Sequence, residues 1–330
     1  MKPKILFISE KWPRNNPAYG MSCLYPTVFT TLTETGLAEF SAIHPDEWLI
    51  TQGERIDGML LTIVGTYEDR PDIIFYSWLS SQGPEPELIG ICNPRMVTWA
   101  RIKTMAPNIK LCGIWGDSAW HMSQQIMRSL NSVFDLHLTL DYVFSPEPHN
   151  YLSLWGYPLS TSIFHGDPTG QRFIDVSFVG SLGERPDRIT AIQELRNRGI
   201  DVKHFGGQTE DRLTVENYAS VLQQSKITLN FSTITSKGRT KEAIACGAFL
   251  LEPETSPTNI WMTPGEDYIT YKMNGDTPDF DDLATKINYY LQHEDERIKV
   301  AKQGYTTMAR KHSPMVWWKT VLGRLGFKND

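Results

Sequence analysis

Residues 229–253 read LNFSTITSKGRTKEAIACGAFLLEP. The short, dense apolar runs at both ends of this stretch are typical of buried parallel strands. Between them lie a Ser-Lys-Gly-Arg turn and a helix-length segment that stops at Cys246-Gly247, and glycine commonly follows the last turn of a helix. The stretch therefore predicts a strand, a helix over residues 239–246 and a second strand, an order that favours a parallel sheet with right-handed crossovers.

The same alternation extends through the second half of the chain. Thr214 is placed to cap one helix, Gly199 and Gly247 to end two others, and Ser313 to cap a last helix that begins with Pro314. Short apolar runs and apolar residues spaced by four give the remaining boundaries. They predict strands at residues 175–180, 202–205, 226–231, 249–252 and 267–271, helices at 186–198, 214–224 and 279–292, and two terminal helices.

Alternation in the first half is similar but less regular. The predicted strands are residues 4–9, 72–78, 110–115 and 138–145. Residues 157–172 are rich in Pro, Gly, Ser and Thr and lack periodicity, which marks a seam between domains. We therefore expect an α/β protein of two doubly wound, Rossmann-like domains that face a cleft. Their expected ranges are 1–160 and 161–312. A further helix is expected at 313–330, and its apolar bulk suits a role in bridging the domains, with the binding of a partner as the alternative.

Composition excludes several classes of protein. The 330 residues are 40% apolar and 21% charged, which is typical of globular proteins, and are enough for two domains. A net charge of −6 argues against nucleic acid as a partner, and no apolar run is long enough for a transmembrane segment. The four cysteines lack metal-site spacing, so reduced thiols in a cytoplasmic protein are expected; they are Cys23, Cys92, Cys112 and Cys246.

The first candidate site is the turn that follows the strand at residues 175–180. Gly180 and Ser181 leave that strand, and Arg185 stands just before the next helix. Backbone amides at such a helix start attract anions, and Arg185 or Arg188 would add a charged fork. An ordinary turn, with glycine serving only its geometry, is the alternative reading. The spacing is not G-x-G-x-x-G, so a nicotinamide cofactor is poorly supported.

The second candidate site is the start of the helix at residues 239–246. Lys237 and Arg239 oppose the helix dipole there, and a bound anion would relieve that repulsion. Glu242 is suited to accept hydrogen bonds from a vicinal diol such as ribose. Taken singly, each residue also fits a surface ion pair or a dipole partner. Together they favour a phosphate-and-ribose site.

The ordered set of motifs in the second half resembles the CgeB-like glycosyltransferases, which belong to the GT-B superfamily with two Rossmann-like domains. The matching segments cover roughly residues 170–315, whereas the first half matches only in general architecture. The segments are DVSFVGSLGER, KITLNFS, GRTKEAIACGAFLLEPE, TPGEDYITY, INYYLQHEDERIKVAKQGY and ARKHS.

The resemblance implies that the second domain binds a nucleotide-diphosphate sugar as the donor substrate. The diphosphate would face Gly180, Ser181, Arg185, Arg239 and Lys237, Glu242 would hold the ribose, and Gly206, Asn230 and Ser232 would border the base or sugar. Many relatives in the superfamily carry a second glutamate eight residues before the ribose-binding one. Ile234 stands at that position here, which leaves the placement of the sugar and the stereochemistry open.

Fixed cations and helix dipoles at the diphosphate would stabilise the charge of the leaving group, so neither a metal nor a cofactor is expected. The nearest match to an Asp-x-Asp metal motif is Asp279-Phe-Asp281. It opens an amphipathic helix, and we interpret it as a helix cap.

The acceptor should be bound by the first domain, from strand ends near Gly20 and Trp115. Asp117 or His121 would take the proton of the acceptor hydroxyl, and Trp115 would stack on a sugar. The alternatives are a helix cap for Asp117 and a core position for Trp115.

The expected function is metal-independent transfer of a sugar to a glycan, protein or small-molecule hydroxyl. A nucleotide-sugar epimerase of the same fold, or a non-catalytic sugar- or protein-binding relative, is the alternative.

Overall fold

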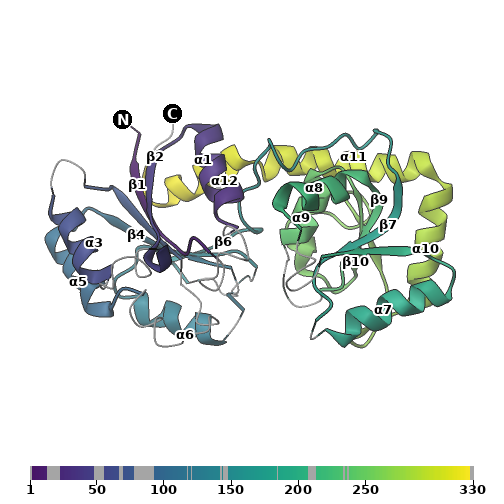
Figure 1. Ribbon diagram of the computed structural model, residues 1–330, viewed down its shortest axis with the longest axis horizontal. Coiled ribbons are helices and arrows are strands. Elements are labelled where there is room, and N and C mark those ends of the chain that lie inside the picture. The colour runs from purple at the N-terminus through teal and green to yellow at the C-terminus, as the bar shows by residue number, and fades with distance from the viewer. Residues whose placement is uncertain are drawn as a thin grey trace. The chain divides into compact units, whose positions relative to one another are not determined.

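The computed structural model divides the chain into two compact units (Figure 1). Unit 1 comprises Met1–Leu154 and Trp317–Asp330, and unit 2 comprises Trp155–Val316. The sequence predicts the domain boundary at residue 160, a few residues later than in the structure. It predicts that the terminal segment begins at residue 313, a few residues before Trp317. The structure describes residues 2–12, 23–47, 56–66, 70–77, 93–116, 118–119, 121–141, 143, 148–183, 185–206, 213–232, 235 and 238–327.

Unit 1 is built on a parallel sheet of order β2-β1-β3-β4-β5-β6. Its strands are β1 (Lys4–Ile8), β2 (Glu39–Ile43), β3 (Ile73–Ser77), β4 (Lys110–Trp115), β5 (Leu136–Thr139) and β6 (Tyr151–Ser153). Its helices are the π-helical turn Tyr25–Phe29, α1 (Thr30–Thr35), α3 (Ile56–Gly65), α5 (Met96–Met105), α6 (His121–Leu130) and α12 (Pro314–Arg324), of which α12 begins in unit 2.

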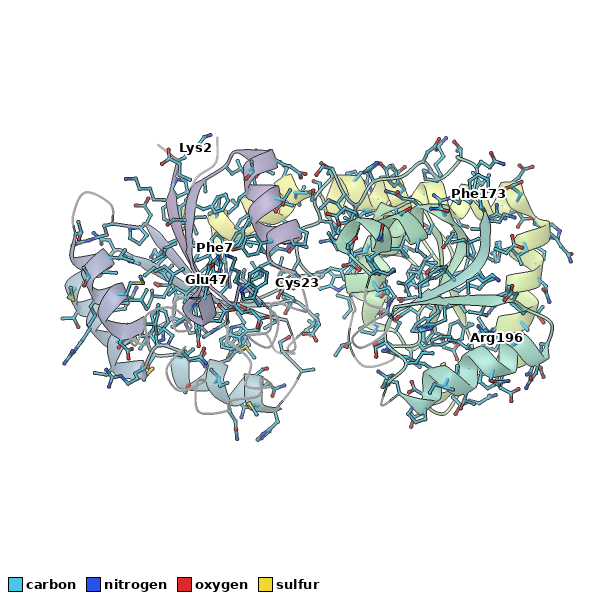
Figure 2. The ribbon with its side chains drawn as sticks, viewed as in Figure 1. Lys2, Phe7, Cys23, Glu47, Phe173 and Arg196 are labelled. Carbon is cyan, nitrogen blue, oxygen red and sulfur yellow. The ribbon has the colours of Figure 1, made fainter. Side chains whose placement is uncertain are left out.

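Aromatic side chains join α12 to the sheet of unit 1. Phe7 of β1 stacks on Phe75 of β3, with ring centroids 5.2 Å apart, and Trp318 meets both rings edge-on. The Trp318 indole donates a hydrogen bond to the Thr31 hydroxyl at 2.9 Å. Figure 2 shows Phe7 enclosed among the side chains of this unit. The apolar bulk of the last helix is therefore explained by its burial in unit 1.

Unit 2 contains a second parallel sheet, of order β8-β7-β9-β10-β11. Its strands are β7 (Ile174–Val179), β8 (Val202–Phe205), β9 (Ser225–Leu229), β10 (Phe249–Pro253) and β11 (Ile269–Tyr271), beside a small hairpin of β12 (Met273–Asn274) and β13 (Thr277–Pro278). Its helices are α7 (Pro186–Asn197), α8 (Val215–Gln224), α9 (Gly238–Ala245), α10 (Phe280–Gln292), α11 (Glu294–Lys311) and the short 3₁₀ turn Pro257–Ile260.

Helices cover both faces of this second sheet. One apolar cluster joins α7 and α10 to Phe178 and Ile227, and another joins α8 and α9 to Val179 and Leu250. Figure 1 shows these two pairs of helices around the strands of unit 2. At the periphery lie Arg196 and the 70% exposed Phe173 (Figure 2). The expectation of two doubly wound α/β domains is therefore confirmed.

Local signals in the sequence set most of the element ends. Thr214 caps α8 by accepting from the Asn217 amide, and Gly199 and Gly247 follow α7 and α9 with φ of 80° and 70°. The strand expected at 138–145 is shifted: β5 spans Leu136–Thr139, and Asp141 beyond it binds Ser118 instead of continuing the ladder. The strands β2 and β6 were not predicted from the sequence, because these edge strands have few buried apolar residues. Among the described cysteines none forms a disulfide.

Candidate functional site

The winding of the second sheet points to one place for a ligand. Starting at β7, the chain moves first to β8 on one side and then to β9 on the other. In doubly wound sheets ligands bind at the carboxyl edge where this reversal occurs. That switch point lies between the ends of β7 and β9, which are followed by Gly180 and Asn230, and α9 comes next in the chain.

A charged side chain lies directly against the turn after β7. Gly180 has a φ of 151°, and a Cβ atom added there would lie 2.1 Å from Nη2 of Arg239. The guanidinium carbon of Arg239 is 4.9 Å from the centre of the Phe178 ring. Only glycine allows this approach of a cation to the backbone at this turn. The close approach explains why Gly180 and Arg239, 59 positions apart by their numbers, act as one feature.

The guanidinium of Arg239 is incompletely hydrogen-bonded within the described part of the chain. Its Nε and Nη1 atoms are buried and make no hydrogen bond there. Buried donors without a partner are costly, and in native proteins they often mark a site for an ion or ligand. The Arg239 side chain is itself partly exposed, so a ligand can reach it.

A second guanidinium shares the same aromatic ring. Arg188 of α7 lies 5.6 Å from the Phe178 ring centre and donates to the Ser181 carbonyl at 2.8 Å. Burial lowers the pKa of Arg188 to about 10, with further lowering by the charges of Arg239 and Arg185 and a small opposing effect of Asp187. Two cations that repel each other would be stabilised by an anion with several oxygens.

An acid lies one turn after Arg239 on α9. Glu242 accepts a hydrogen bond from the Tyr218 hydroxyl through Oε2, while Oε1 would lie 3.3 Å from a Cβ placed on Gly238. Burial raises the pKa of the Glu242 carboxyl, and the Tyr218 hydrogen bond and the charges of Arg239 and Lys241 oppose that rise. A carboxylate beside Arg239 and Lys241 is suited to accept from hydroxyls next to a phosphate.

The end of β8 supports the same turn. The Nε2 atom of His204 lies 2.8 Å from the Gly180 carbonyl oxygen, and the Gly180 amide donates to the Phe205 carbonyl at 2.9 Å. A Cβ on Gly206, which has a φ of 91°, would lie 3.5 Å from the Gly180 nitrogen. The structure thus brings Gly206, Gly180 and Arg239 together.

Asn230 and Ser232, which follow β9, are buried instead of lining an open surface. The Asn230 amide donates to Oε1 of Glu252 at 2.9 Å, and the Ser232 hydroxyl donates to the Thr235 carbonyl at 2.9 Å. Burial raises the pKa of Glu252 to about 7, against the opposing effects of Ser256, Thr258, Asn230 and Arg239. Asn230 and Glu252 are 1% and 0% exposed, so they support the edge of the sheet from within.

The remaining predicted site residues make other contacts or lie outside the described residues. The Arg185 guanidinium donates to both carboxylate oxygens of Asp187, at 2.9 and 2.7 Å, while Arg188 takes the position beside Arg239. Ser181 follows Gly180, and its hydroxyl accepts from the Gly183 amide at 3.2 Å. The predicted residues Gly20, Asp117 and Lys237, and the departure at Ile234, lie outside the described residues.

The structure corrects the expectation that Trp115 stacks on a sugar. Trp115 is 3% exposed, and its indole nitrogen lies 3.1 Å from Nδ1 of His137, so it belongs to the core of unit 1. Its apolar bulk, which suggested a sugar platform, is used for packing against Tyr76. His121 is the exposed first residue of α6.

Sequence reasoning missed two members of the site. Phe178 looks like any core residue of a strand, and Tyr218 looks like an ordinary residue of a helix. Neither pattern indicates that one ring carries two guanidiniums or that one phenol contacts Glu242. Only the folded arrangement shows these roles.

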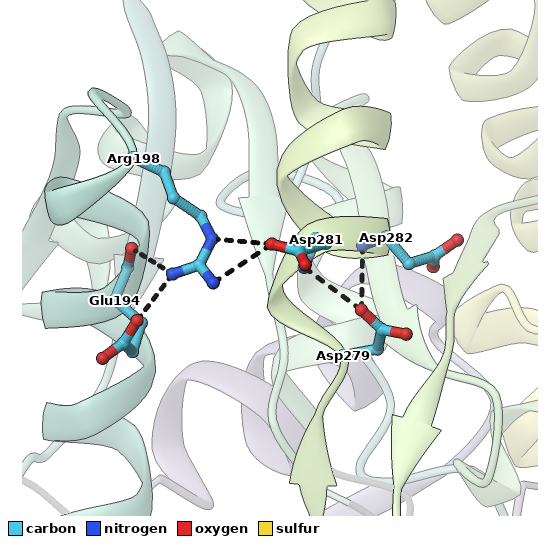
Figure 3. Close-up of polar contacts among 5 residues, drawn as sticks. All are labelled: Glu194, Arg198, Asp279, Asp281 and Asp282. Carbon is cyan, nitrogen blue, oxygen red and sulfur yellow. Dashed lines mark hydrogen bonds and ion pairs between the residues drawn. The ribbon is translucent and has the colours of Figure 1, made fainter.

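The carboxylates at the start of α10 are structural. Asp279 accepts hydrogen bonds from the amides of Asp281 and Asp282 at 3.1 and 3.0 Å, and Arg198 binds Asp281 (Figure 3). The interpretation of this motif as a helix cap is confirmed. Among the described residues, no three His, Cys, Asp or Glu side chains gather as a metal site would require. In the same part of the chain we find no helix whose length and apolar character would let it span a bilayer.

Residues 187–323 match the protein family described as "Glycosyl transferase-like". No curated protein sequence gives a significant match to this chain. Similarity is found instead among solved structures at low sequence identity.

Three of these structures have TM-scores between 0.55 and 0.66. HepE of Anabaena, solved with UDP, is 13% identical with a TM-score of 0.61, over 99% of this chain and 100% of HepE. The catalytic domain of starch synthase IV from Arabidopsis thaliana, bound to ADP and acarbose, is 9% identical with a TM-score of 0.66, over 99% and 100%. TarM of S. aureus is 11% identical with a TM-score of 0.55, over 77% of this chain.

The match to TarM covers 54% of that protein, so this chain spans about half its length. Identities of this size establish the fold alone. Together with the two parallel sheets, they show that the chain has the GT-B fold of two Rossmann-like domains.

Proposed function

We propose that this chain is a glycosyltransferase that binds a nucleoside-diphosphate sugar at the carboxyl edge of the unit 2 sheet. The observation that carries the proposal is the Arg239 guanidinium, held against Gly180 at the switch point with two buried nitrogens that have no hydrogen-bond partner among the described residues. A pyrophosphate supplies the oxygens that this group lacks. The family match over residues 187–323 and the UDP or ADP in the structures of HepE and starch synthase IV support the same class of ligand.

The chemistry follows from the charges of the site. When the bond between sugar and phosphate breaks, negative charge develops on the diphosphate. Arg239 and Arg188 are fixed by the Phe178 ring and by the Ser181 carbonyl, so they stabilise that charge without reorganisation. Glu242 accepts from the ribose hydroxyls and sets the distance between ribose and diphosphate. We propose that no metal takes part in the reaction, because these cations perform the task of one.

The acceptor hydroxyl must lose its proton to a base. Asp117 and His121 remain the proposed candidates, and His121 is exposed at the start of α6 in unit 1, as a base requires. We further propose that the transferred group is a hexose or a related sugar, that the acceptor is a glycan, a protein or a small molecule, and that the enzyme is a cytoplasmic member of the CgeB-like group.

A calorimetric screen with UDP, GDP, ADP and TDP tests the binding half of the proposal. At least one of them should bind, and the corresponding nucleotide sugar should be turned over when an acceptor is present. Isomerised sugar without acceptor would identify an epimerase. Binding without turnover across a broad acceptor panel would indicate a non-catalytic binding protein. Absence of binding by all four nucleotides would refute the site.

A further inference from the structure

The contact between Tyr218 and Glu242 joins two helices at the proposed ribose site. Tyr218 lies on α8 and Glu242 on α9, 24 positions later, and the phenol donates to Oε2 of the carboxylate. Both side chains are partly exposed, so a ligand that reaches Glu242 also reaches the neighbourhood of Tyr218. The ring of Tyr218 is held from the other side by Phe164, whose centroid is 6.2 Å away.

The two oxygens of the carboxylate have different surroundings. The Tyr218 hydroxyl binds Oε2, whereas Oε1 lies close to Gly238, the first residue of α9. Glycine at this position leaves the space that a side chain would fill, on the same turn of helix as Arg239. Oε1 is therefore the oxygen that faces the start of α9, where the proposed diphosphate is held.

We infer that Tyr218 is a positioning residue, which fixes Oε2 of Glu242 so that Oε1 accepts from a ribose hydroxyl of the nucleotide. The inference rests on the proposed function, because it assigns the sugar of the nucleotide to Glu242. A hydrogen bond at one oxygen restricts the rotation of the carboxylate, so the second oxygen is placed to discriminate between nucleotides with and without the hydroxyl.

The same contact favours the ionised form of the acid. Burial alone favours the neutral carboxyl and raises the pKa of Glu242, whereas the hydrogen bond from Tyr218 favours the charged form. The other groups whose charges act on Glu242 are Arg239 and Lys241 on its own helix. Burial raises the pKa of the Cys246 thiol, and the charge of Glu242 adds to that rise. Loss of the phenol should therefore make ribose recognition dependent on pH.

Tyr218→Phe removes the hydroxyl and keeps the ring, so the packing against Phe164 is retained. We would measure the Kd of UDP and 2′-deoxy-UDP, and of ADP and 2′-deoxy-ADP, by calorimetry at pH 6, 7 and 8. In the unchanged protein the ribonucleotide should bind roughly tenfold more tightly than its deoxy analogue, about 1.4 kcal/mol. In Tyr218→Phe that ratio should fall below roughly threefold and should decrease further as the pH falls. Ionisation of the ligand affects both proteins equally and cancels.

Tyr289→Phe is the matched control. The Tyr289 hydroxyl donates to Oε1 of Glu296 at 2.9 Å, a phenol–carboxylate contact that has no part in the proposed site. It should leave the ratio and its pH dependence unchanged. Carboxyl NMR titration of the ligand-free protein gives a second readout, in which Tyr218→Phe should raise the pKa of one glutamate.

Three results would overturn the inference. If Glu242→Gln loses the preference for the ribonucleotide but Tyr218→Phe keeps it at every pH, the site stands and the role of Tyr218 is wrong. If the glutamate pKa does not move, the phenol does not hold the carboxylate ionised. If the unchanged protein binds neither UDP nor ADP, the proposed function fails and the ribose assignment fails with it.

Discussion

Unit 1 and unit 2 contain sheets of the same winding, with strand orders β2-β1-β3-β4-β5-β6 and β8-β7-β9-β10-β11. In unit 1 the buried or half-buried acids hold neighbouring backbone. Asp57 accepts from the Arg95 amide and side chain, and Asp135 accepts from Lys103 and the Leu111 amide. In unit 2, Arg239 lies at the switch point with two buried nitrogens that have no partner among the described residues.

The two units share the winding of their sheets but differ in how their charged side chains are paired. Both windings create a carboxyl edge at which a ligand can bind. In the described parts of the chain, the charges of unit 1 named above already have partners, whereas Arg188 and Arg239 of unit 2 have buried nitrogens without a hydrogen-bond partner. Function therefore follows from the side chains that come after the strands and not from the sheets themselves.

The largest difference between the two units is expected when one glycine in each unit is replaced by alanine. A Cβ on Gly180 would lie 2.1 Å from Arg239 Nη2, and a Cβ on Gly113 would lie 2.5 Å from the Trp115 indole nitrogen. Gly180→Ala should displace the guanidinium and weaken UDP or ADP binding by more than about tenfold, or about 1.4 kcal/mol. Gly113→Ala should instead lower the stability of unit 1, by roughly 1–3 kcal/mol.

Calorimetry and urea denaturation of both glycine variants separate these effects. Folded Gly180→Ala with the affinity of the unchanged protein would show that the turn after β7 does not carry the ligand. Weak binding by a folded Gly113→Ala protein would place the ligand in unit 1.

A second test compares two charged residues. Arg239→Ala should weaken nucleoside-diphosphate binding about tenfold, or about 1.4 kcal/mol. It should change the stability little, because two of the Arg239 nitrogens have no hydrogen-bond partner among the described residues. Asp57→Ala should cost about 1–3 kcal/mol of unfolding free energy, since it leaves the donors of Arg95 and Thr98 unpaired. Calorimetry and urea denaturation measure the two effects, and an exchange of these outcomes would reverse our assignment of the two units.

A smaller effect is expected within unit 2, at the start of α10. Asp279→Ala removes the cap formed with the amides of Asp281 and Asp282, and should lower the stability by about 1 kcal/mol. Nucleotide affinity and sugar transfer should stay the same, with or without a metal chelator. A chelator that abolishes transfer by the unchanged protein would contradict the proposal of a metal-free reaction.

The smallest net effect concerns pH, because two buried groups oppose each other. Burial raises the pKa of Glu252 in unit 2 to about 7 and lowers the pKa of His137 in unit 1 to about 4. The contribution of Glu252 is therefore full below its usual pKa and is lost as pH rises through about 7. The contribution of His137 is full above its usual pKa and is lost as pH falls toward about 4.

Denaturation curves between pH 4 and 7 check this prediction. Glu252→Gln should remove the loss of stability that accompanies a rise of pH to about 7, and His137→Gln should remove the loss that accompanies a fall of pH to about 4. Two variants with the same pH dependence as the unchanged protein would show that neither group titrates differently in the folded state.

Much of the fold could be predicted from the sequence, because buried parallel strands are short apolar runs and helix ends carry Thr214, Gly199 and Gly247. The edge strands β2 and β6 could not, since half-exposed strands lack such a run. For the site, charge at a helix start pointed to Arg239 and Glu242. The pairing of Arg239 with Gly180, and of Glu242 with Tyr218, depends on which strands and helices become neighbours, and local sequence does not record that.

A crystal structure of this chain with UDP or ADP bound would test most directly whether Arg239 and the Gly180 turn bind the pyrophosphate. Our account predicts the pyrophosphate within hydrogen-bond distance of the Arg239 guanidinium, beside the Gly180 backbone, and a ribose hydroxyl at Glu242. A pyrophosphate at the carboxyl edge of the unit 1 sheet, or one that contacts neither Gly180 nor Arg239, would contradict it.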